Sequence, residues 1–74
     1  MNIHVKCLNN LSRENVCNAH ASTLHEVPTG TTARELATRL QLNPDKIKLV
    51  FINYKESEPD TELHEEDDIA FSPY

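Results

Sequence analysis

The side chains best suited to metal or acid–base chemistry in this chain are four histidines, and their spacing gives them no local way to act together. No two of them stand at i, i+4 or in a His-x-His arrangement, the spacings that bring two imidazoles to one metal ion. We therefore expect no metal site and no cofactor. The four are His4, His20, His25 and His64.

The two cysteines offer little more. Cys7 and Cys17 are separated by a spacing typical of neither a zinc site nor a redox pair. In the reducing cytoplasm, the default location, we expect free thiols and no disulfide. Cys7 alternates with Val5 and is expected to be a small core residue, whereas Cys17 stands in a polar stretch without a basic neighbour to activate it. We expect no catalytic residues and no enzymatic activity.

Length sets a second limit on function. The 74 residues suffice for a single domain over 1–74, and so short a chain buries only about 60% of its unfolded surface, which leaves no room for a deep substrate cavity. With Gly30 as the single glycine, no nucleotide-binding fingerprint is possible. No apolar run approaches the roughly 20 residues of a membrane span. The start of the chain is typical of a strand and not of a signal peptide.

Charge is concentrated in one part of the chain. The net charge is -5, and most of the 12 acidic residues stand between Glu56 and Asp68. Such a field repels nucleic acid and attracts a basic protein surface. A solvated loop that only keeps the protein soluble explains the same run equally well. The acidic residues of this stretch are Glu56, Glu58, Asp60, Glu62, Glu65, Glu66, Asp67 and Asp68.

Hydrophobic periodicity predicts the elements that must position these residues. Ile3, Val5 and Cys7 alternate with polar neighbours, as in a half-buried strand, and a polar loop follows over 9–18. A second extended segment is expected over 21–27. Pro28, Thr29 and Gly30 end it.

A helix is predicted next. Thr32 and Glu35 form a capping box, and apolar residues recur behind it at helical spacing. Pro44 cannot continue the helix, so the predicted helix has about ten residues. Its apolar stripe consists of Ala33, Leu36, Ala37 and Leu40.

The remaining segments complete a sheet. The strongest strand signal is 47–52, residues 53–55 turn it into a short polar return, and 69–71 form a last strand after the acidic loop. The predicted order is strand, strand, helix, strand, acidic loop, strand. One helix packed on one face of a small mixed sheet, an α+β fold, is the solution that buries these elements.

Three segments resemble one family. The passage Pro28-Thr29-Gly30-Thr31-Thr32-Ala33-Arg34-Glu35-Leu36, the strand Val50-Phe51-Ile52-Asn53, and the ending Asp60-Thr61-Glu62-Leu63 with Glu66-Asp67-Asp68-Ile69-Ala70-Phe71-Ser72-Pro73 are similar to those of ThiS/MoaD-type sulfur-carrier proteins. The first strand fits as well, so the resemblance covers most of the chain outside 9–22.

The resemblance implies a ubiquitin-like β-grasp fold and a role in sulfur transfer for molybdenum or tungsten cofactor or thiamin biosynthesis. The implied partners are an E1-like adenylating enzyme and an acceptor or synthase subunit. Family members act through a flexible C-terminal Gly-Gly tail, with glycines because a Cβ would clash in the narrow channel. Here the sequence stops at Tyr74 without them, so Ser72, Pro73 and Tyr74 correspond to the lead-in of the tail. Either the given sequence lacks a few terminal residues, which the well-kept lead-in Phe71-Ser72-Pro73 favours, or this member carries no sulfur.

The partner-docking surface is predicted from strand alternation. Val50 and Ile52 should face the helix, which leaves Leu49, Phe51 and Leu8 on the opposite face of the sheet. An apolar patch rimmed by charge is typical of a docking site, although scattered surface apolar residues need no explanation.

Two further functions stay open. One is a tail-less β-grasp module that binds a partner and transfers no group. The other is a regulatory module like the TGS domains, which share the passage Gly30 to Ala37 and are embedded in longer chains.

Overall fold

A computed structural model describes residues 1–8 and 22–73, and the predicted loop over 9–18 lies outside them. Within these ranges the chain forms five strands, one α-helix and one short 3-10 helix. In chain order they are β1 (Asn2–Cys7), β2 (Thr23–Glu26), α1 (Ala33–Arg39), η2 (Pro44–Lys46), β3 (Leu49–Ile52), β4 (Lys55–Ser57) and β5 (Asp68–Ser72).

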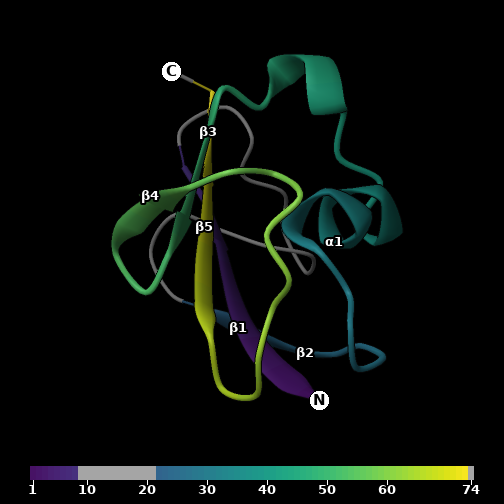
Figure 1. The fold of residues 1–74 in the computed structure, drawn as a ribbon. Coiled ribbons are helices and arrows are strands. Elements are labelled where there is room, and N and C mark those ends of the chain that lie inside the picture. Colours follow the sequence, from purple (N-terminus) through teal and green to yellow (C-terminus); the bar gives the residue numbers. More distant parts are fainter. Residues whose placement is uncertain (9–21, 74) are drawn as a thin grey trace.

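The strands form one mixed sheet in the order β2-β1-β5-β3-β4. The two central strands, β1 and β5, run parallel, and the other three neighbouring pairs are antiparallel. Parallel neighbours need a long crossover connection, and here it contains α1, which covers one face of the sheet (Figure 1). The prediction of an α+β fold with one helix on a small mixed sheet is confirmed.

Alternation along β1 sets which side chains face α1. Ile3, Val5 and Cys7 are buried, and the residues between them are half-buried. The parallel pairing with β5 places Val5 beside Ile69 and Cys7 beside Phe71, so buried residues of both strands share one face. The sequence predicted the alternation of β1 from its period of two, whereas its pairing register with β5 is seen only in the structure.

The start of α1 follows the predicted capping box. The Glu35 backbone N–H donates to the Thr32 hydroxyl oxygen at 3.2 Å, and the Thr32 N–H donates to the Glu35 carboxylate at 3.1 Å. Two backbone donors that a helix start leaves unpaired are thereby satisfied.

The end of α1 comes earlier than predicted. The helix spans seven residues instead of about ten because Gln41, at φ 60°, adopts the left-handed conformation. The Leu42 N–H then donates to the Ala37 carbonyl and the Gln41 N–H to the Thr38 carbonyl, the two bonds of a Schellman motif. Glycine usually occupies this position, so glutamine gave no signal. Pro44, predicted as the stop, instead begins η2.

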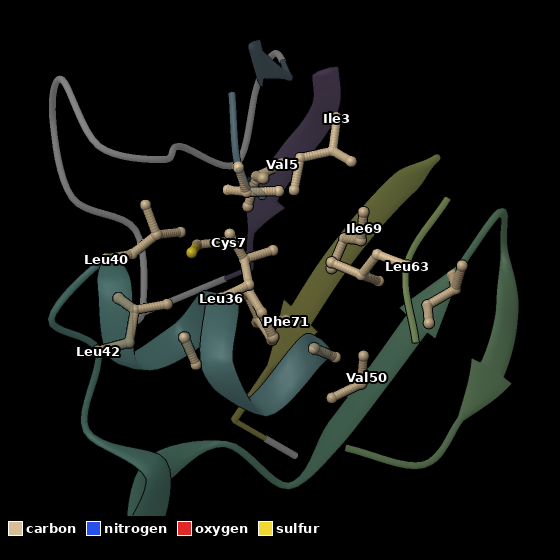
Figure 2. Close-up of a cluster of buried hydrophobic side chains, with 14 residues drawn as sticks. Ile3, Val5, Cys7, Leu36, Leu40, Leu42, Val50, Leu63, Ile69 and Phe71 are labelled. Carbon is tan, nitrogen blue, oxygen red and sulfur yellow. The ribbon is translucent and has the colours of Figure 1, made fainter. Parts of the chain in front are cut away.

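The core lies between α1 and the sheet (Figure 2). Every residue predicted to pack there is buried, Leu36 completely. The core also takes in residues that the sequence analysis left out, namely Val27, Leu42 and Leu63. Leu63 is the most informative, because it anchors the acidic loop: its N–H donates to the Thr31 carbonyl, and it is 1% exposed.

Strand boundaries differ from the predictions where local patterns are weak. The second and fourth predicted segments shorten to β2 and β3, and β5 extends past the predicted 69–71 at both ends. The polar return after β3 is itself a strand, β4, so the sheet has five strands where four were expected. Neither helical segment within 1–8 and 22–73 has the length and apolar character that crossing a membrane requires.

Candidate docking surface

The sheet face opposite α1, termed the open face, carries the three residues predicted to dock a partner. Leu49 and Phe51 are half-buried and alternate with Val50 and Ile52, which are buried in the core. Leu8 is half-buried just beyond β1, and its N–H donates to the Phe71 carbonyl at 2.9 Å. This bond continues the pairing of β1 with β5, so Leu8 keeps the alternation of the strand.

Strand register brings Phe51 into a row with residues distant in sequence. Phe51 pairs with Ala70 on one side and with Glu56 on the other, and Ala70 also pairs with Lys6. Because paired residues point to the same face, these four side chains cross the open face in one line. Ala70 is the smallest of them, which leaves a hollow in the middle of the row.

This open-face hollow has a volume of about 50 Å³. Small-molecule sites measure about 300–1,000 Å³, so the hollow suits one side chain of a docked protein better than a free substrate. It is lined by Lys6, Ser22, Phe51, Tyr54, Asp68, Ile69 and Ala70.

Tyr54 stands at the edge of this hollow, and the sequence analysis missed it as a site residue. It is 90% exposed and occupies the second position of the two-residue turn between β3 and β4. Both turn residues have positive φ, 53° at Asn53 and 68° at Tyr54, as a type I′ hairpin requires. Asparagine tolerates this conformation, but a bulky aromatic residue rarely adopts it. The signal in the sequence that could have identified this residue is a tyrosine directly after Asn53, where a two-residue turn favours glycine.

A buried carboxylate holds the turn against β5. Asp67, 9% exposed, accepts from the Asn53 side-chain amide at 2.9 Å and from the His64 N–H at 2.8 Å. The Asn53 carbonyl oxygen of the side chain in turn accepts from the Asp68 N–H at 3.0 Å. One member of the acidic stretch is therefore a structural acceptor and not a solvated charge.

Asp68, next along the chain, differs from Asp67. Its side chain is half-buried at the hollow, and within the described ranges its carboxylate accepts no hydrogen bond and joins no ion pair. The neighbouring carboxylate of Glu66 instead contacts His4, whose Nε2 lies 3.0 Å from Glu66 Oε2. The open face therefore combines apolar side chains with an unpaired negative charge.

A second apolar residue of this face was also missed. Leu24 on β2 pairs with His4, so it shares the open face, and it is 61% exposed. Its segment lacked strict alternation, and only the pairing with β1 shows which way it points.

The predicted lead-in to a C-terminal tail is fixed to the sheet. Ser72 is buried, pairs with Leu49, and accepts from the Lys48 N–H at 2.8 Å. Pro73 is half-buried, and Tyr74 lies outside the described residues. The last strand thus ends beside Leu49, one of the docking residues.

A larger hollow of about 460 Å³ lies beside α1 and offers no comparable chemistry. Its Thr31 hydroxyl already donates to the Pro28 carbonyl and its Thr38 hydroxyl to the Arg34 carbonyl. The Arg34 guanidinium pairs with Asp60 at 3.0 Å. These three donors are engaged within the fold, which leaves Arg39 as the lining cation without an ion pair among the described residues.

The prediction of a free thiol is wrong for Cys7. Cys7 is buried and disulfide-bonded, and the described part of the chain contains no free cysteine. Cys17, the other cysteine of the sequence, lies outside that part. The spacing rule for cysteines tests for metal and redox motifs, and it gives no information on whether a cysteine forms a structural disulfide. Disulfides persist mainly in oxidising compartments, so the cytoplasmic location remains a prediction.

Within the same ranges no group of three or more His, Cys, Asp or Glu residues converges on a point where a metal ion could bind. His64 lies near Asp67, with Nδ1 and Oδ2 3.8 Å apart, and His20 falls outside those ranges. No protein-family model matches the chain, and a search of curated proteins returns no match.

Proposed function

We propose that this chain is a ubiquitin-like β-grasp domain, similar to the ThiS/MoaD-type sulfur carriers, and that it works by docking its open face onto partner proteins. The strand order β2-β1-β5-β3-β4, with parallel central strands and a crossing helix, supports the β-grasp assignment. The partners would be an E1-like adenylating enzyme and an acceptor subunit, as the sequence resemblance implies.

The observation that carries the proposal is the position of β5. This strand presents Ala70 in the centre of the open face and ends at Ser72, which pairs with Leu49. A partner that covers Leu49 and Phe51 therefore sits where the chain leaves the sheet. In a sulfur carrier this arrangement delivers the terminal carboxylate to the partner that holds the open face.

The chemistry belongs to the partner and the terminal carboxylate. The carboxylate attacks the α-phosphate of ATP, forms an acyl-adenylate and releases pyrophosphate. A sulfide donor then displaces AMP and leaves a thiocarboxylate. The carrier contributes position, because an oriented reactant avoids the entropic cost of a bimolecular encounter.

The experiment is intact-mass measurement on the protein isolated from its native source, before and after incubation with ATP, an E1-like enzyme and a sulfide donor. We expect a C-terminal extension ending in Gly-Gly, then a mass increase equal to the exchange of one oxygen for sulfur. Incubation without ATP is the control and should leave the mass unchanged. A mature, unproteolysed chain that ends at Tyr74 would refute the carrier role and leave a β-grasp docking module.

Charge should affect the rate of docking. Glu56, Asp68 and Glu66 lie on or beside the open face. A basic partner would be steered toward them, so the association rate should fall as salt rises. Stopped-flow measurement at low and high ionic strength, with the activating enzyme as partner, tests this. A rate that does not depend on salt would remove the acidic stretch from the docking mechanism.

A further inference from the structure

Tyr54 combines two properties that rarely occur together, a strained backbone and an almost fully exposed aromatic ring. Its φ of 68° falls in the left-handed region, where a bulky side chain is disfavoured, and its ring is not used in the core. Glycine after Asn53 would fit the type I′ turn without that cost. Strain at an exposed residue is typical of sites where the side chain is needed for binding.

The surroundings of the ring indicate what it binds. Tyr54 and Phe51 place two aromatic rings at the open-face hollow, and Asp68 places there a half-buried carboxylate that has no partner within 1–8 and 22–73. Aromatic faces attract cations, and a carboxylate pairs with a guanidinium through two parallel hydrogen bonds. A planar guanidinium can stack on a ring and meet a carboxylate edge at the same time, which an ammonium group cannot do.

We infer that Tyr54, Phe51 and Asp68 form a binding site for one arginine side chain of a partner protein. The hollow of about 50 Å³ has room for a single side-chain tip, and Glu56, paired with Phe51, adds negative charge at the rim. Lys6 is the one cation that lines the hollow, and it opposes binding from the far side of Ala70. Its long apolar stem allows the ammonium group to turn toward solvent.

The inference rests on the proposed docking role of the open face and adds the chemistry of the contact. The test uses the isotope-labelled full chain, observed by NMR, with acetyl-Gly-Arg-Gly-amide as the probe. The control probe replaces arginine with citrulline, which keeps the shape and removes the charge. We expect the arginine peptide to shift the amide signals of residues 51, 54, 68 and 70 and to bind at least tenfold more tightly than the citrulline peptide.

Four variants at the site and one control variant on η2 locate it. Tyr54→Gly should weaken arginine-peptide binding at least tenfold while raising the midpoint of chemical denaturation, because glycine relieves the turn. Tyr54→Phe should retain binding. Asp68→Asn should weaken it at least tenfold, whereas Asp45→Asn, the same change of charge on η2, should leave it unaltered. Lys6→Ala should strengthen binding severalfold.

Several outcomes would overturn the site. They are equal affinity for arginine and citrulline peptides, no binding of either, unchanged binding by Tyr54→Gly, and lower stability of Tyr54→Gly. The proposed function fails separately. If Phe51→Asp abolishes binding of the activating enzyme while Tyr54→Gly leaves peptide affinity unchanged, the docking role stands and the arginine site is wrong. If peptide binding follows Tyr54 and no thiocarboxylate forms, the arginine site stands without the carrier role.

Discussion

The two faces of the sheet are built from alternate residues of the same strands, yet they differ in what their side chains do. On the α1 face, Val5, Val50 and Ile69 are buried against Leu36 and its neighbours. On the open face, Phe51 and Ala70 remain partly accessible beside the half-buried carboxylate of Asp68. Alternate residues of one strand therefore either pack in the core or stay accessible for the proposed docking. Changes on one face should unfold the domain, and changes on the other should alter binding.

The largest effect should come from the packed face. Leu36→Ala removes a completely buried side chain from between α1 and the sheet and should lower the free energy of unfolding by about 2–5 kcal/mol. Chemical denaturation measures it. Leu24→Ala, the same change on the open face at a 61% exposed position, is the matched control and should cost about 0.5 kcal/mol or less. Similar losses at both positions would remove the distinction between the faces.

The second-largest effect is expected at Asp67, the buried carboxylate that holds the turn between β3 and β4 against β5. Asp67→Ala leaves the Asn53 amide and the His64 N–H without their acceptor and should cost about 1–3 kcal/mol. Asp60→Ala removes a carboxylate that, among the described residues, pairs with the exposed Arg34 alone, and it should cost about 0.5 kcal/mol or less. Thermal or urea unfolding of both variants compares them. Equal stabilities would mean that the buried carboxylate does not hold the turn.

A smaller effect is expected at the start of α1. Thr32→Ala removes the hydroxyl that accepts from the Glu35 N–H and should cost about 1 kcal/mol. Thr32→Ser keeps the acceptor and should restore most of the stability. If serine and alanine destabilise alike, the capping bond contributes little and the loss comes from the half-buried methyl group.

The smallest effect on stability, with the largest on binding, is expected on the open face. Phe51→Asp should change the free energy of unfolding by about 1 kcal/mol or less, yet weaken binding of the activating enzyme at least tenfold, because it places a charge in the desolvated contact. Leu8→Asp should act in the same way if the two residues share the surface. Titration calorimetry and denaturation of the same preparations separate the two quantities. An unfolded Phe51→Asp variant would show that the open face is structural.

The sequence alone determined the elements whose signals are local. The capping box of Thr32 and Glu35 located the start of α1, because both hydrogen bonds span three residues. Alternation in β1 and β3 assigned buried and accessible residues correctly, because burial of one face leaves only one register. The helix end was predicted too late, because Gln41 adopts the left-handed conformation that glycine usually occupies at the end of a helix.

Only the tertiary structure decided what meets on the open face. The row across this face draws on three strands, through Phe51, Ala70 and Lys6. The turn that carries Tyr54 lies beside Asp68 because the Asn53 side chain accepts a hydrogen bond from the Asp68 N–H. Those contacts depend on strand register between distant segments, which no local periodicity encodes. The burial of Leu63 was likewise not predicted, because the residues around it are acidic. Leu63 is buried because its backbone pairs with that of Thr31. Local sequence set which residues could be apolar or charged, and long-range backbone hydrogen bonding set which of them became neighbours.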